Sequence, residues 1–251
     1  MDKITIVFIL GALDIGGTEK QFLETVRRLN RNRFVPKVLA FPCFGKLREE
    51  IEAFDIPFTC LDFLGLAGKF RPESYRQLWR LFRDMVRSFR REKPHIVQSY
   101  LFWANIYGCL AAKIAGVPVI ITGRREVLDN DSMKPHYRWL QNFSNFWASA
   151  IVANSHGAKQ QCLKQERYVD NKKITVIYNG IDLNKYAPYC KTENKKRTFH
   201  IPDDHCVIGI IARLRRYKGH RDFLEAAALV AQTYPKTIFL IIGRDEEDMQ
   251  A

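Results

Sequence analysis

The sequence lacks the features that identify several classes of protein. Its 251 residues contain no apolar run of the roughly 18 to 20 residues needed to span a bilayer. The first ten residues have neither the basic flank nor the cleavage site of a signal peptide. The six cysteines form no CxxC pair and no histidine cluster accompanies them, so we expect free thiols in a reducing cytosol. Glycine and proline are ordinary, and 47% hydrophobic residues exclude a disordered or fibrous chain.

Acidic residues are in deficit. The chain has 27 Asp and Glu against 40 Lys and Arg, a formal net charge of +13, which indicates an anionic partner such as a nucleotide, nucleic acid or lipid surface. Binding of nucleic acid also needs exposed aromatic side chains that stack on bases. We expect the aromatic side chains here to lie mainly in the core, and therefore expect no nucleic acid partner; this concerns Trp103, His136, Trp139, Phe143, Phe146 and Trp147.

Strands and helices alternate along most of the chain. The apolar run at 4–10 predicts a buried parallel strand, and residues 18–30 have helical spacing. Further strands are expected at 35–41, 58–61, 96–99, 117–122, 150–154 and 174–178, with helices at 46–54, 71–93, 103–115, 136–148 and 157–165. This order predicts an α/β fold with an open parallel sheet covered on both faces. The loops that follow the strands, at 11–17, 99–103, 122–127, 154–156 and 178–182, should then meet at one crevice.

The composition changes after residue 181. Residues 182–204 are polar and rich in lysine, as in a linker, and 205–251 contain a new strand, helix and strand at 207–211, 219–233 and 237–242. We therefore expect one domain at 1–181, a linker at 182–204 and part of a second domain at 205–251. Two strands and one helix bury too little apolar surface to be stable alone. We expect either that this chain is part of a longer one or that the small unit docks on the first domain.

Two loops are candidates for binding phosphate. The loop at 11–17 joins a strand to a helix, and Gly16 and Gly17 would let a phosphate or sugar approach backbone N–H groups at the start of that helix. The loop matches neither the dinucleotide fingerprint nor the P-loop, and a tight turn with Thr18 as N-cap is the alternative.

The second loop, at 212–219, is strongly basic. Arg213 offers a forked guanidinium, Lys218 a point charge, and the helix that follows adds the positive end of its dipole. This combination favours a diphosphate, and the alternative is a solvated charged loop.

Taken in order, several motifs make the chain resemble the retaining glycosyltransferases of family 4, which have the GT-B fold of two Rossmann-like domains. The resemblance covers nearly the whole chain and rests on the segments at 16–19, 45–47, 56–58, 93–97, 153–155, 173–182, 209–214 and 218–219. It implies an N-terminal, acceptor-side Rossmann-like domain and the first βαβ unit of a nucleotide-sugar-binding domain.

The resemblance also implies a reaction and its residues. A sugar would pass from a nucleotide-sugar, such as a UDP- or GDP-sugar, to an acceptor hydroxyl with retention of configuration, without a metal or other cofactor. The acceptor would be a carbohydrate or lipid-linked molecule in polysaccharide or cell-envelope synthesis. Arg213 and Lys218 match the pair that binds the diphosphate and are the expected catalytic residues. The expected substrate-binding residues are Gly16, Gly17, Glu19, Arg124, Asn154, Asn179 and Gly180.

Two departures from the family pattern matter. The EX7E motif, which contacts the donor, is absent from these 251 residues, so an inactive fragment that folds and binds acceptor or membrane is the alternative function. Many relatives also have a histidine after the strand at 117–122, where this chain has Arg124 and Arg125. Arg124 would bind an anionic group, or the two arginines would form a surface pair neutralised by Glu126.

A row of arginines on one helix offers a further partner. Arg76, Arg80, Arg83 and Arg87 are spaced 4, 3 and 4 residues apart and continue to Arg90 or Arg91, which places them on one face. Such a face suits anionic lipid, and would put a cytoplasmic protein at the inner face of the plasma membrane. The alternative is an ordinary solvated face.

Overall fold

The computed structural model describes residues 3–11, 13, 16–41, 45, 47–61, 72–125, 135–186, 196, 199–215 and 218–244. The chain divides into two compact units, Met1–Leu183 and Asn184–Ala251. The division falls two residues after the expected end of the first domain at 181. Each unit is described by itself below.

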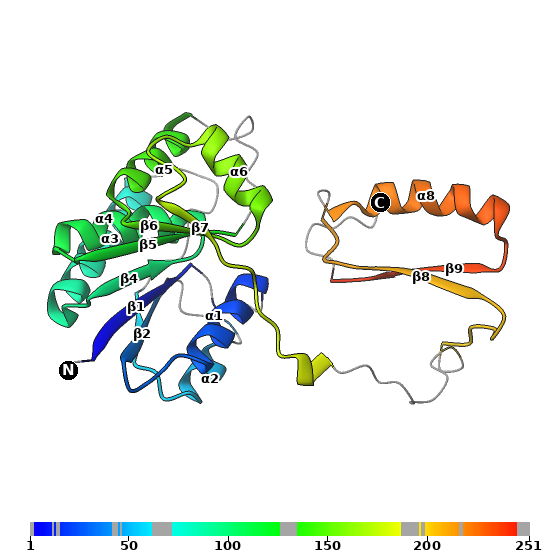
Figure 1. Ribbon diagram of the computed structural model, residues 1–251, viewed down its shortest axis with the longest axis horizontal. Helices are drawn as coiled ribbons and strands as arrows, with labels where there is room; N and C mark the ends of the chain where they lie inside the picture. Colours follow the sequence, from blue (N-terminus) through cyan, green and yellow to red (C-terminus); the bar gives the residue numbers. More distant parts are fainter. Residues whose placement is uncertain are drawn as a thin grey trace. The chain divides into compact units, whose positions relative to one another are not determined.

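The first unit is built on a seven-stranded sheet in which every neighbouring pair of strands is parallel (Figure 1). Its order is β3-β2-β1-β4-β5-β6-β7. The strands are β1 (Ile4–Leu10), β2 (Phe34–Ala40), β3 (Phe58–Cys60), β4 (Ile96–Ser99), β5 (Val119–Arg124), β6 (Ala150–Ala153) and β7 (Ile174–Val176). The order reverses direction between β1 and β4, which lie side by side although 85 residues separate their adjoining ends in the chain.

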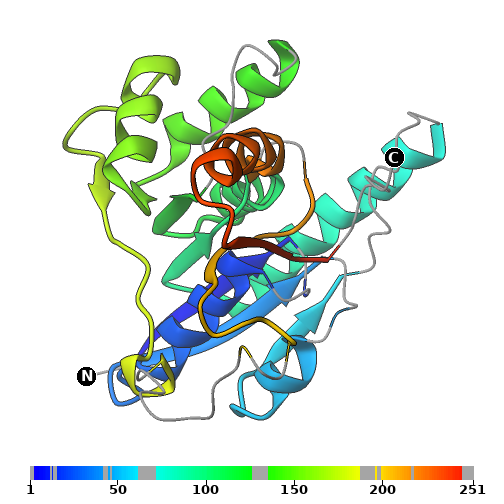
Figure 2. The ribbon, with the colours of Figure 1, turned by 90° about the vertical axis from the view of Figure 1, so that its right-hand side faces the viewer.

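Helices cover both faces of this sheet, as the alternation of elements predicts. They are α1 (Gly17–Arg27), α2 (Leu47–Glu52), α3 (Pro72–Glu92), α4 (Phe102–Ala115), α5 (Pro135–Trp147) and α6 (His156–Gln165). In Figure 2 the blue helices α1 and α2 lie on one side of the sheet and the green helices α5 and α6 on the other. Successive side chains of β1 alternate between the two faces: Phe8 packs in the cluster that contains α1 and α2, and Ile9 in the cluster that contains α3 and α4.

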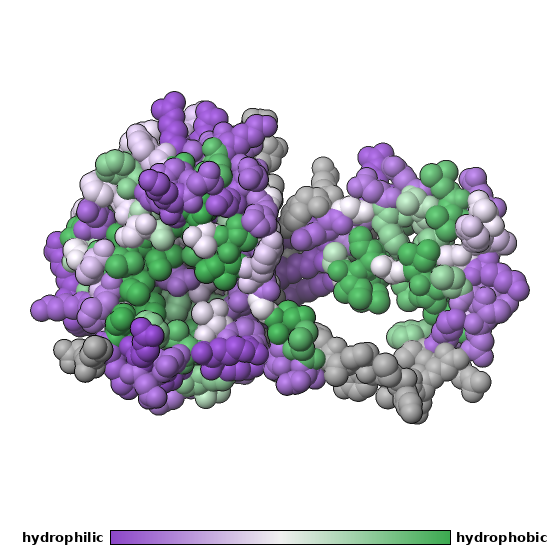
Figure 3. Space-filling view, in the orientation of Figure 1, coloured by the Kyte–Doolittle hydropathy of each residue, from purple (hydrophilic) through white to green (hydrophobic). Residues whose placement is uncertain are grey.

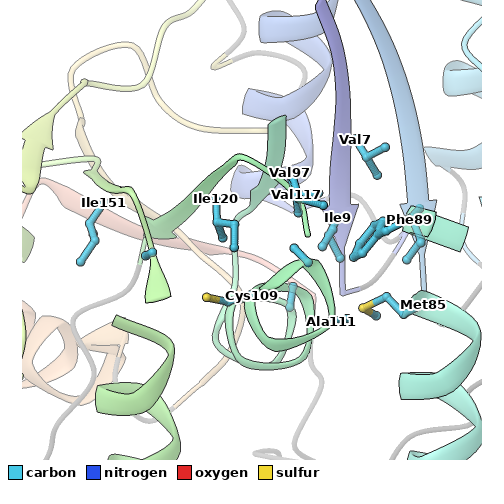
Figure 4. Packing of buried hydrophobic residues seen from close by; sticks show 14 of the residues in the cluster. Val7, Ile9, Met85, Phe89, Val97, Cys109, Ala111, Val117, Ile120 and Ile151 are labelled. Carbon is cyan, nitrogen blue, oxygen red and sulfur yellow. The ribbon is translucent and has the colours of Figure 1, made fainter. Parts of the chain in front are cut away.

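Helix α4 packs closely on the sheet because small residues line its inner side. A Cβ atom at Gly108 would lie 2.3 Å from Cδ1 of Ile9, so a larger residue at this point would require the Ile9 side chain to move. In Figure 4, Cys109 and Ala111 project from α4, and Ile9 lies close to Phe89 of α3. The helix ends as expected at Gly116, which adopts the left-handed conformation with φ of 79°.

The second unit contains two parallel strands and one helix: β8 (Cys206–Ile211), α8 (His220–Thr233) and β9 (Thr237–Ile242). Apolar side chains stay exposed on it, with Ile211 81% exposed and Leu229 68% exposed. Figure 3 shows this apolar surface in green on the second unit. This exposure of apolar side chains agrees with the prediction that two strands and one helix bury little apolar surface.

The structure corrects three predictions about single residues. The N-cap of α1 is Gly16, and no side chain caps that helix end, so the expected cap by Thr18 is wrong. Cys60 is disulfide-bonded, whereas Cys109, Cys162 and Cys206 are free; spacing along the chain does not reveal which thiols the fold brings together. Trp139 is 63% exposed, Phe146 is 51% exposed and His136 is exposed, so these three residues are not core residues.

Candidate functional site

The topology places the candidate site at the carboxyl ends of the strands. In open parallel sheets ligands bind where the strand order reverses, which here is between β1 and β4. The segments that leave the strands at this edge begin after Leu10, Ser99, Arg124 and Ala153, and another follows Val176. These are the loops that the sequence predicts to meet at one crevice.

The start of α1 is an uncapped helix end next to this reversal point. Gly16 is extended, with φ of −120°, and its carbonyl accepts a hydrogen bond from Lys20 N–H at 3.1 Å. A Cβ atom at Gly17 would meet nothing within 4 Å. Packing therefore does not require glycine at 17, and the space beside this backbone is open to a ligand. Glu19, in the same first turn, is buried.

Arg125 lies directly after β5 and is held from several sides. Its guanidinium carbon is 5.0 Å from the centroid of the Tyr100 ring, a cation–π contact. Its Nη1 donates to Oδ1 of Asn179 at 2.6 Å. Within the described part of the chain its buried Nε–H has no hydrogen-bond acceptor. Burial lowers the pKa of Arg125 and raises that of Tyr100, and the pair remains a cation on a neutral ring.

Asn154 and Gly180 form hydrogen bonds that connect the loops after β6 and β7 to neighbouring elements. The Asn154 side chain donates from Nδ2 to the carbonyl of Arg125 at 3.2 Å, and its backbone N–H donates to the carbonyl of Arg124 at 3.1 Å. Gly180 N–H donates to Oε1 of Gln21 on α1 at 2.9 Å. The segment 179–180 is thus bonded both to the end of β5 and to α1. Of the expected substrate-binding residues, these bonds bring Asn154 and Asn179 together through Arg125.

Arg124 is buried and held by an ion pair. Its side chain is 7% exposed and pairs with Glu166, 13% exposed, through Nε at 3.0 Å and Nη2 at 2.9 Å. Asn145 bonds to both partners. Burial opposes ionisation of both groups, but the opposite charge outweighs it, so that the pKa of Glu166 is lowered and that of Arg124 raised.

The pairing corrects the two readings of Arg124. Its guanidinium is occupied by protein acceptors, which argues against contact with a substrate, and Glu166 neutralises it; Glu126 lies outside the described residues. Strand alternation explains the difference, because successive residues at the end of β5 face opposite ways. Arg125, the next residue, bonds to Asn179 and stacks on Tyr100 at this edge.

A buried amide joins the ends of β4 and β5. Asn105 of α4 accepts from Ser99 Oγ at 2.7 Å and donates to the carbonyl of Gly123 at 2.7 Å. A Cβ atom at Gly123 would lie 3.1 Å from the Ser99 carbonyl oxygen and from Tyr100 Cα, so the two strand ends approach at a glycine. Next to this amide lies a cavity of about 20 Å³, which holds no more than one water.

In the second unit the basic loop follows β8. Arg213 and Lys218 are both exposed. Buried His220 donates from Nε2 to the carbonyl of Arg213 at 2.9 Å and so fixes the backbone of the loop. Gly219, with φ of 76°, is the N-cap of α8. The loop thus presents two cations at the carboxyl end of a strand and at the start of a helix.

The arginine row on α3 is solvent-exposed, as its spacing predicts. Arg76, Arg80, Arg83 and Arg87 are exposed, and Leu81, Met85, Val86 and Phe89 are buried on the other side of the helix. Asp84 is near two of the arginines, at 3.0 Å from Arg83 and 3.6 Å from Arg87. Trp79 on the same helix is 66% exposed.

Sequence reasoning missed the roles of Tyr100, Glu166 and Gln21. Tyr100 directly follows β4, and its place at the reversal of strand order was the signal that could have found it. Nothing in the local sequence pairs Glu166 with Arg124, 42 residues away. In the parts of the chain that the structure describes, no three His, Cys, Asp or Glu side chains form a metal cluster. None of the described helices is long and apolar enough to cross a bilayer.

The fold and site together define a class: a doubly wound α/β protein with its binding edge at the carboxyl ends of the strands, followed by a smaller unit of two parallel strands and one helix. The chain belongs to glycosyltransferase family 4, whose family model, "Glycosyltransferase Family 4", matches residues 15–185. The resemblance expected from the motifs is confirmed.

Relatives and solved structures agree with this assignment. The chain is 29% identical over 242 residues to UDP-Gal:alpha-D-GlcNAc-diphosphoundecaprenol alpha-1,3-galactosyltransferase of Escherichia coli, covering 92% of this chain and 60% of the relative. It is 27% identical to the capsular polysaccharide biosynthesis glycosyltransferase CapM of Staphylococcus aureus, over 65% of this chain and 44% of the relative. The chain therefore spans about three fifths of the length of the E. coli relative.

Among solved structures, the crystal structure of Anabaena Alr3699/HepE in complex with UDP superposes with a TM-score of 0.76 at 21% identity, covering 98% of this chain and 63% of that one. At this identity the likeness shows the fold, and the expected GT-B architecture is confirmed.

Proposed function

We propose that this chain acts in the transfer of a sugar from a nucleotide-sugar to an acceptor hydroxyl, with retention of anomeric configuration. The observation that carries the proposal is the family match over 15–185 on a sheet whose binding edge is lined by an uncapped glycine-rich helix start and by Arg125. The E. coli relative is named for a diphosphoundecaprenol-linked acceptor and the S. aureus relative for capsular polysaccharide. Their names support a carbohydrate or lipid-linked acceptor in polysaccharide or cell-envelope synthesis.

In this proposal the second unit holds the diphosphate of the donor. Arg213 and Lys218 are its catalytic residues, because the charge that grows on the leaving diphosphate needs preorganised cations. The bond from His220 to the Arg213 carbonyl holds the loop in place before the donor binds. A UDP- or GDP-sugar provides the required diphosphate, and two cations neutralise it without a metal.

The first unit then receives the acceptor. Gly16, Gly17 and Glu19 lie at the start of α1, where the space beside Gly17 is open. Arg125 takes the role expected of Arg124, since it follows β5 directly, is partly exposed and forms no ion pair with an acid among the described residues. Asn154, Asn179 and Gly180 place the loops around that arginine.

Calorimetric titration of the 251-residue chain with UDP and with pyrophosphate tests the diphosphate site. Replacing Arg213 or Lys218 with Ala should each raise Kd by about 10- to 100-fold, because a hydrogen bond to a charged group is lost. Arg221→Ala is the matched control, since Arg221 is exposed on α8 and pairs with Glu225. An equal Kd for all three variants and the unchanged chain would refute the assignment.

Transfer itself is tested with labelled UDP- and GDP-sugars and a diphosphoundecaprenol-linked acceptor, with the anomeric configuration of the product read by NMR. The second candidate function is a catalytically inactive unit that binds acceptor or membrane only. The absence of the EX7E motif from these 251 residues favours it. Acceptor binding without turnover supports this second candidate, and a product of inverted configuration contradicts the first.

We also propose that α3 rests on an anionic membrane at the inner face of the plasma membrane. The row of Arg76, Arg80, Arg83 and Arg87 supplies the charge, and exposed Trp79 supplies an aromatic side chain of the kind that settles at interfaces. A lipid-linked acceptor would be reached from that position.

Flotation with vesicles that contain phosphatidylglycerol tests the membrane contact at low salt. The double reversal Arg83→Glu and Arg87→Glu should abolish most binding, since juxtamembrane cations contribute about 1 kcal/mol each. The control is an equal reversal at Arg31 and Arg48, which are exposed but lie outside α3. Equal losses in the two double variants would show that only net charge matters.

A further inference from the structure

A second cavity lies at the edge of the sheet opposite the candidate site. Its volume is about 420 Å³, and it is formed where α3 and α4 end and where β4 and β5 begin. Phe89, Pro94 and Val117, all buried, form its apolar part, together with the end of α4. Ligand sites for small molecules have volumes of roughly 300 to 1,000 Å³, so this cavity has room for one.

The polar groups of this cavity are basic. Arg90, Lys93 and His95 line it and are exposed, and none of the described acidic residues does so. The nearest acid in sequence, Glu92, is bonded to Lys37 and to Arg91. Lys93 has no ion-pair partner within the described part of the chain. The cations at this edge are therefore not neutralised by the described acids.

His95 adds a ring N–H donor to these two cations. Its Nδ1 accepts a hydrogen bond from the backbone N–H of Thr5 at 3.0 Å. In the neutral imidazole the proton is then on Nε2, which remains free to donate. An anion in the cavity would meet this N–H as well as the two cations.

The C-terminal ends of α3 and α4 also border this cavity, and their partial negative charge disfavours the binding of an anion. Each helix C-terminus carries roughly half a negative charge, so two ends give about −1 against +2 from Arg90 and Lys93. The carbonyls at the end of α4 are also bonded: Gly116 N–H donates to the Lys113 carbonyl at 3.1 Å. Arg90 reaches the Ile114 carbonyl at 3.4 Å with a single Nη2–H and keeps its other donors. The net potential stays positive.

Lys93 stands in a conformation that does not suit a side chain. Its φ is 43°, directly after the end of α3, where glycine is the usual residue. Glycine would relieve the strain and remove the cation. Replacing Lys93 with glycine therefore tests what the ammonium group contributes to binding without lowering the stability of the fold.

We propose that this cavity binds a small amphiphile, a single phosphate or carboxylate joined to an apolar body. The anionic group would lie between Arg90, Lys93 and His95, and the apolar body against Phe89, Pro94 and Val117. This site is separate from the sugar-transfer site, because it lies at the other ends of the strands. It does not depend on the proposed function.

Titration of the whole chain with octyl phosphate, below its micelle concentration, tests the proposal. Octyl phosphate should bind at least about tenfold more tightly than inorganic phosphate and than octyl glucoside, because each of these offers only half of the contacts. Equal affinity for either of the two half-ligands, or no binding of octyl phosphate, would overturn it. The amide signal of Gly116 in NMR spectra should shift on binding, since this residue lines the cavity.

Variants locate the binding. Lys93→Gly should weaken octyl phosphate by about tenfold or more while the melting temperature stays at or above that of the unchanged chain. Ala115→Leu, which adds volume beside the cavity at the end of α4, should also weaken it. Arg48→Glu on α2, exposed and outside the cavity, is the control and should leave affinity within about twofold at high salt. Unchanged affinity in both Lys93→Gly and Ala115→Leu would overturn the site.

A membrane lipid and a soluble metabolite can both join an anionic group to an apolar body. Binding to vesicles distinguishes these two kinds of ligand. The comparison is made in the Arg83→Glu and Arg87→Glu background, which removes the α3 contact proposed above. If Ala115→Leu then lowers binding to vesicles of phosphatidic acid as well as to octyl phosphate, the occupant is a membrane lipid. If it lowers only octyl phosphate binding, the occupant is a soluble amphiphile. Loss of vesicle binding alone would contradict the cavity as the amphiphile site.

Discussion

Removing the charge of Glu166 while keeping its shape should destabilise the first unit strongly. Glu166→Gln leaves the guanidinium of Arg124 buried without its counter-ion, at a site where the two side chains are 7% and 13% exposed. Breaking one partner of a buried, hydrogen-bonded ion pair costs about 3 to 5 kcal/mol. For a unit of this size each kcal/mol lowers the melting temperature by about 2 to 4 °C, so the expected decrease is about 6 to 20 °C.

Tryptophan fluorescence during urea or thermal unfolding measures the stability of the first unit. All four tryptophans of the chain lie in the first unit, so the signal is independent of unfolding in the second. The control is Glu52→Gln, which removes an exposed ion pair with Arg48 at 2.8 Å. Exposed pairs contribute about 0 to 1 kcal/mol, and the melting temperature of this control should change by only a few degrees.

A double-mutant cycle with Arg124→Met measures how much of the stability lost in Glu166→Gln comes from the interaction between Arg124 and Glu166. The double variant should be no less stable than Glu166→Gln alone, because the second change removes the buried charge that the first leaves uncompensated. If Glu166→Gln unfolds at the same temperature as Glu52→Gln, or if the two single losses add, the reasoning about this pair fails.

The pH dependence of stability gives a second test of Glu166: its folded pKa lies below the unfolded value of about 4.3, so its stabilisation is complete above that value and is lost as pH falls below it. The Gln variant should therefore lose less stability between about pH 5 and pH 3 in chemical unfolding. Gly123→Ala should destabilise by about 1 to 3 kcal/mol, because Cβ would press on backbone 3.1 Å away, whereas Gly17→Ala should leave stability within about 1 kcal/mol. Equal effects of these two changes would contradict the assigned packing. Burial raises the pKa of Cys109 to about 12, so iodoacetamide at pH 8 should label exposed Cys206 and leave Cys109 unmodified in mass spectra of the native chain.

Most of the fold of the first unit follows from hydrophobic patterning. The run at Ile4–Leu10 and the segment Ile96–Ser99 were predicted at their exact bounds, because each is a short apolar strand between clear loop or breaker residues. The ends of helices were less accurate: α2 is shorter than expected, because the backbone N–H groups of Phe54 and Asp55 bond three residues back instead of four. Hydrophobic periodicity predicts where strands lie in the sequence but not which strands pair, so it did not predict the pairing of β1 with β4.

The site was predictable in place but only partly in its residues. Loops at the carboxyl ends of parallel strands have to meet, and glycine at 16 and 17 marks an open helix start. The choice between Arg124 and Arg125 depends on which side of β5 each residue faces, and the expected strand ended two residues too early to show it. Partners distant in the chain, such as Glu166 for Arg124, become visible only in the folded structure.

The lengths of the outermost strands have a consequence for handling the protein. In the large sheet the outer strands β3 and β7 have three residues each, too few to offer another molecule a long row of free backbone groups. Strands β8 and β9 have six residues each, carry no charge or proline and are rich in isoleucine. Aggregation of concentrated or warmed samples should therefore begin at β8 and β9, and charged substitutions there are the means of suppressing it.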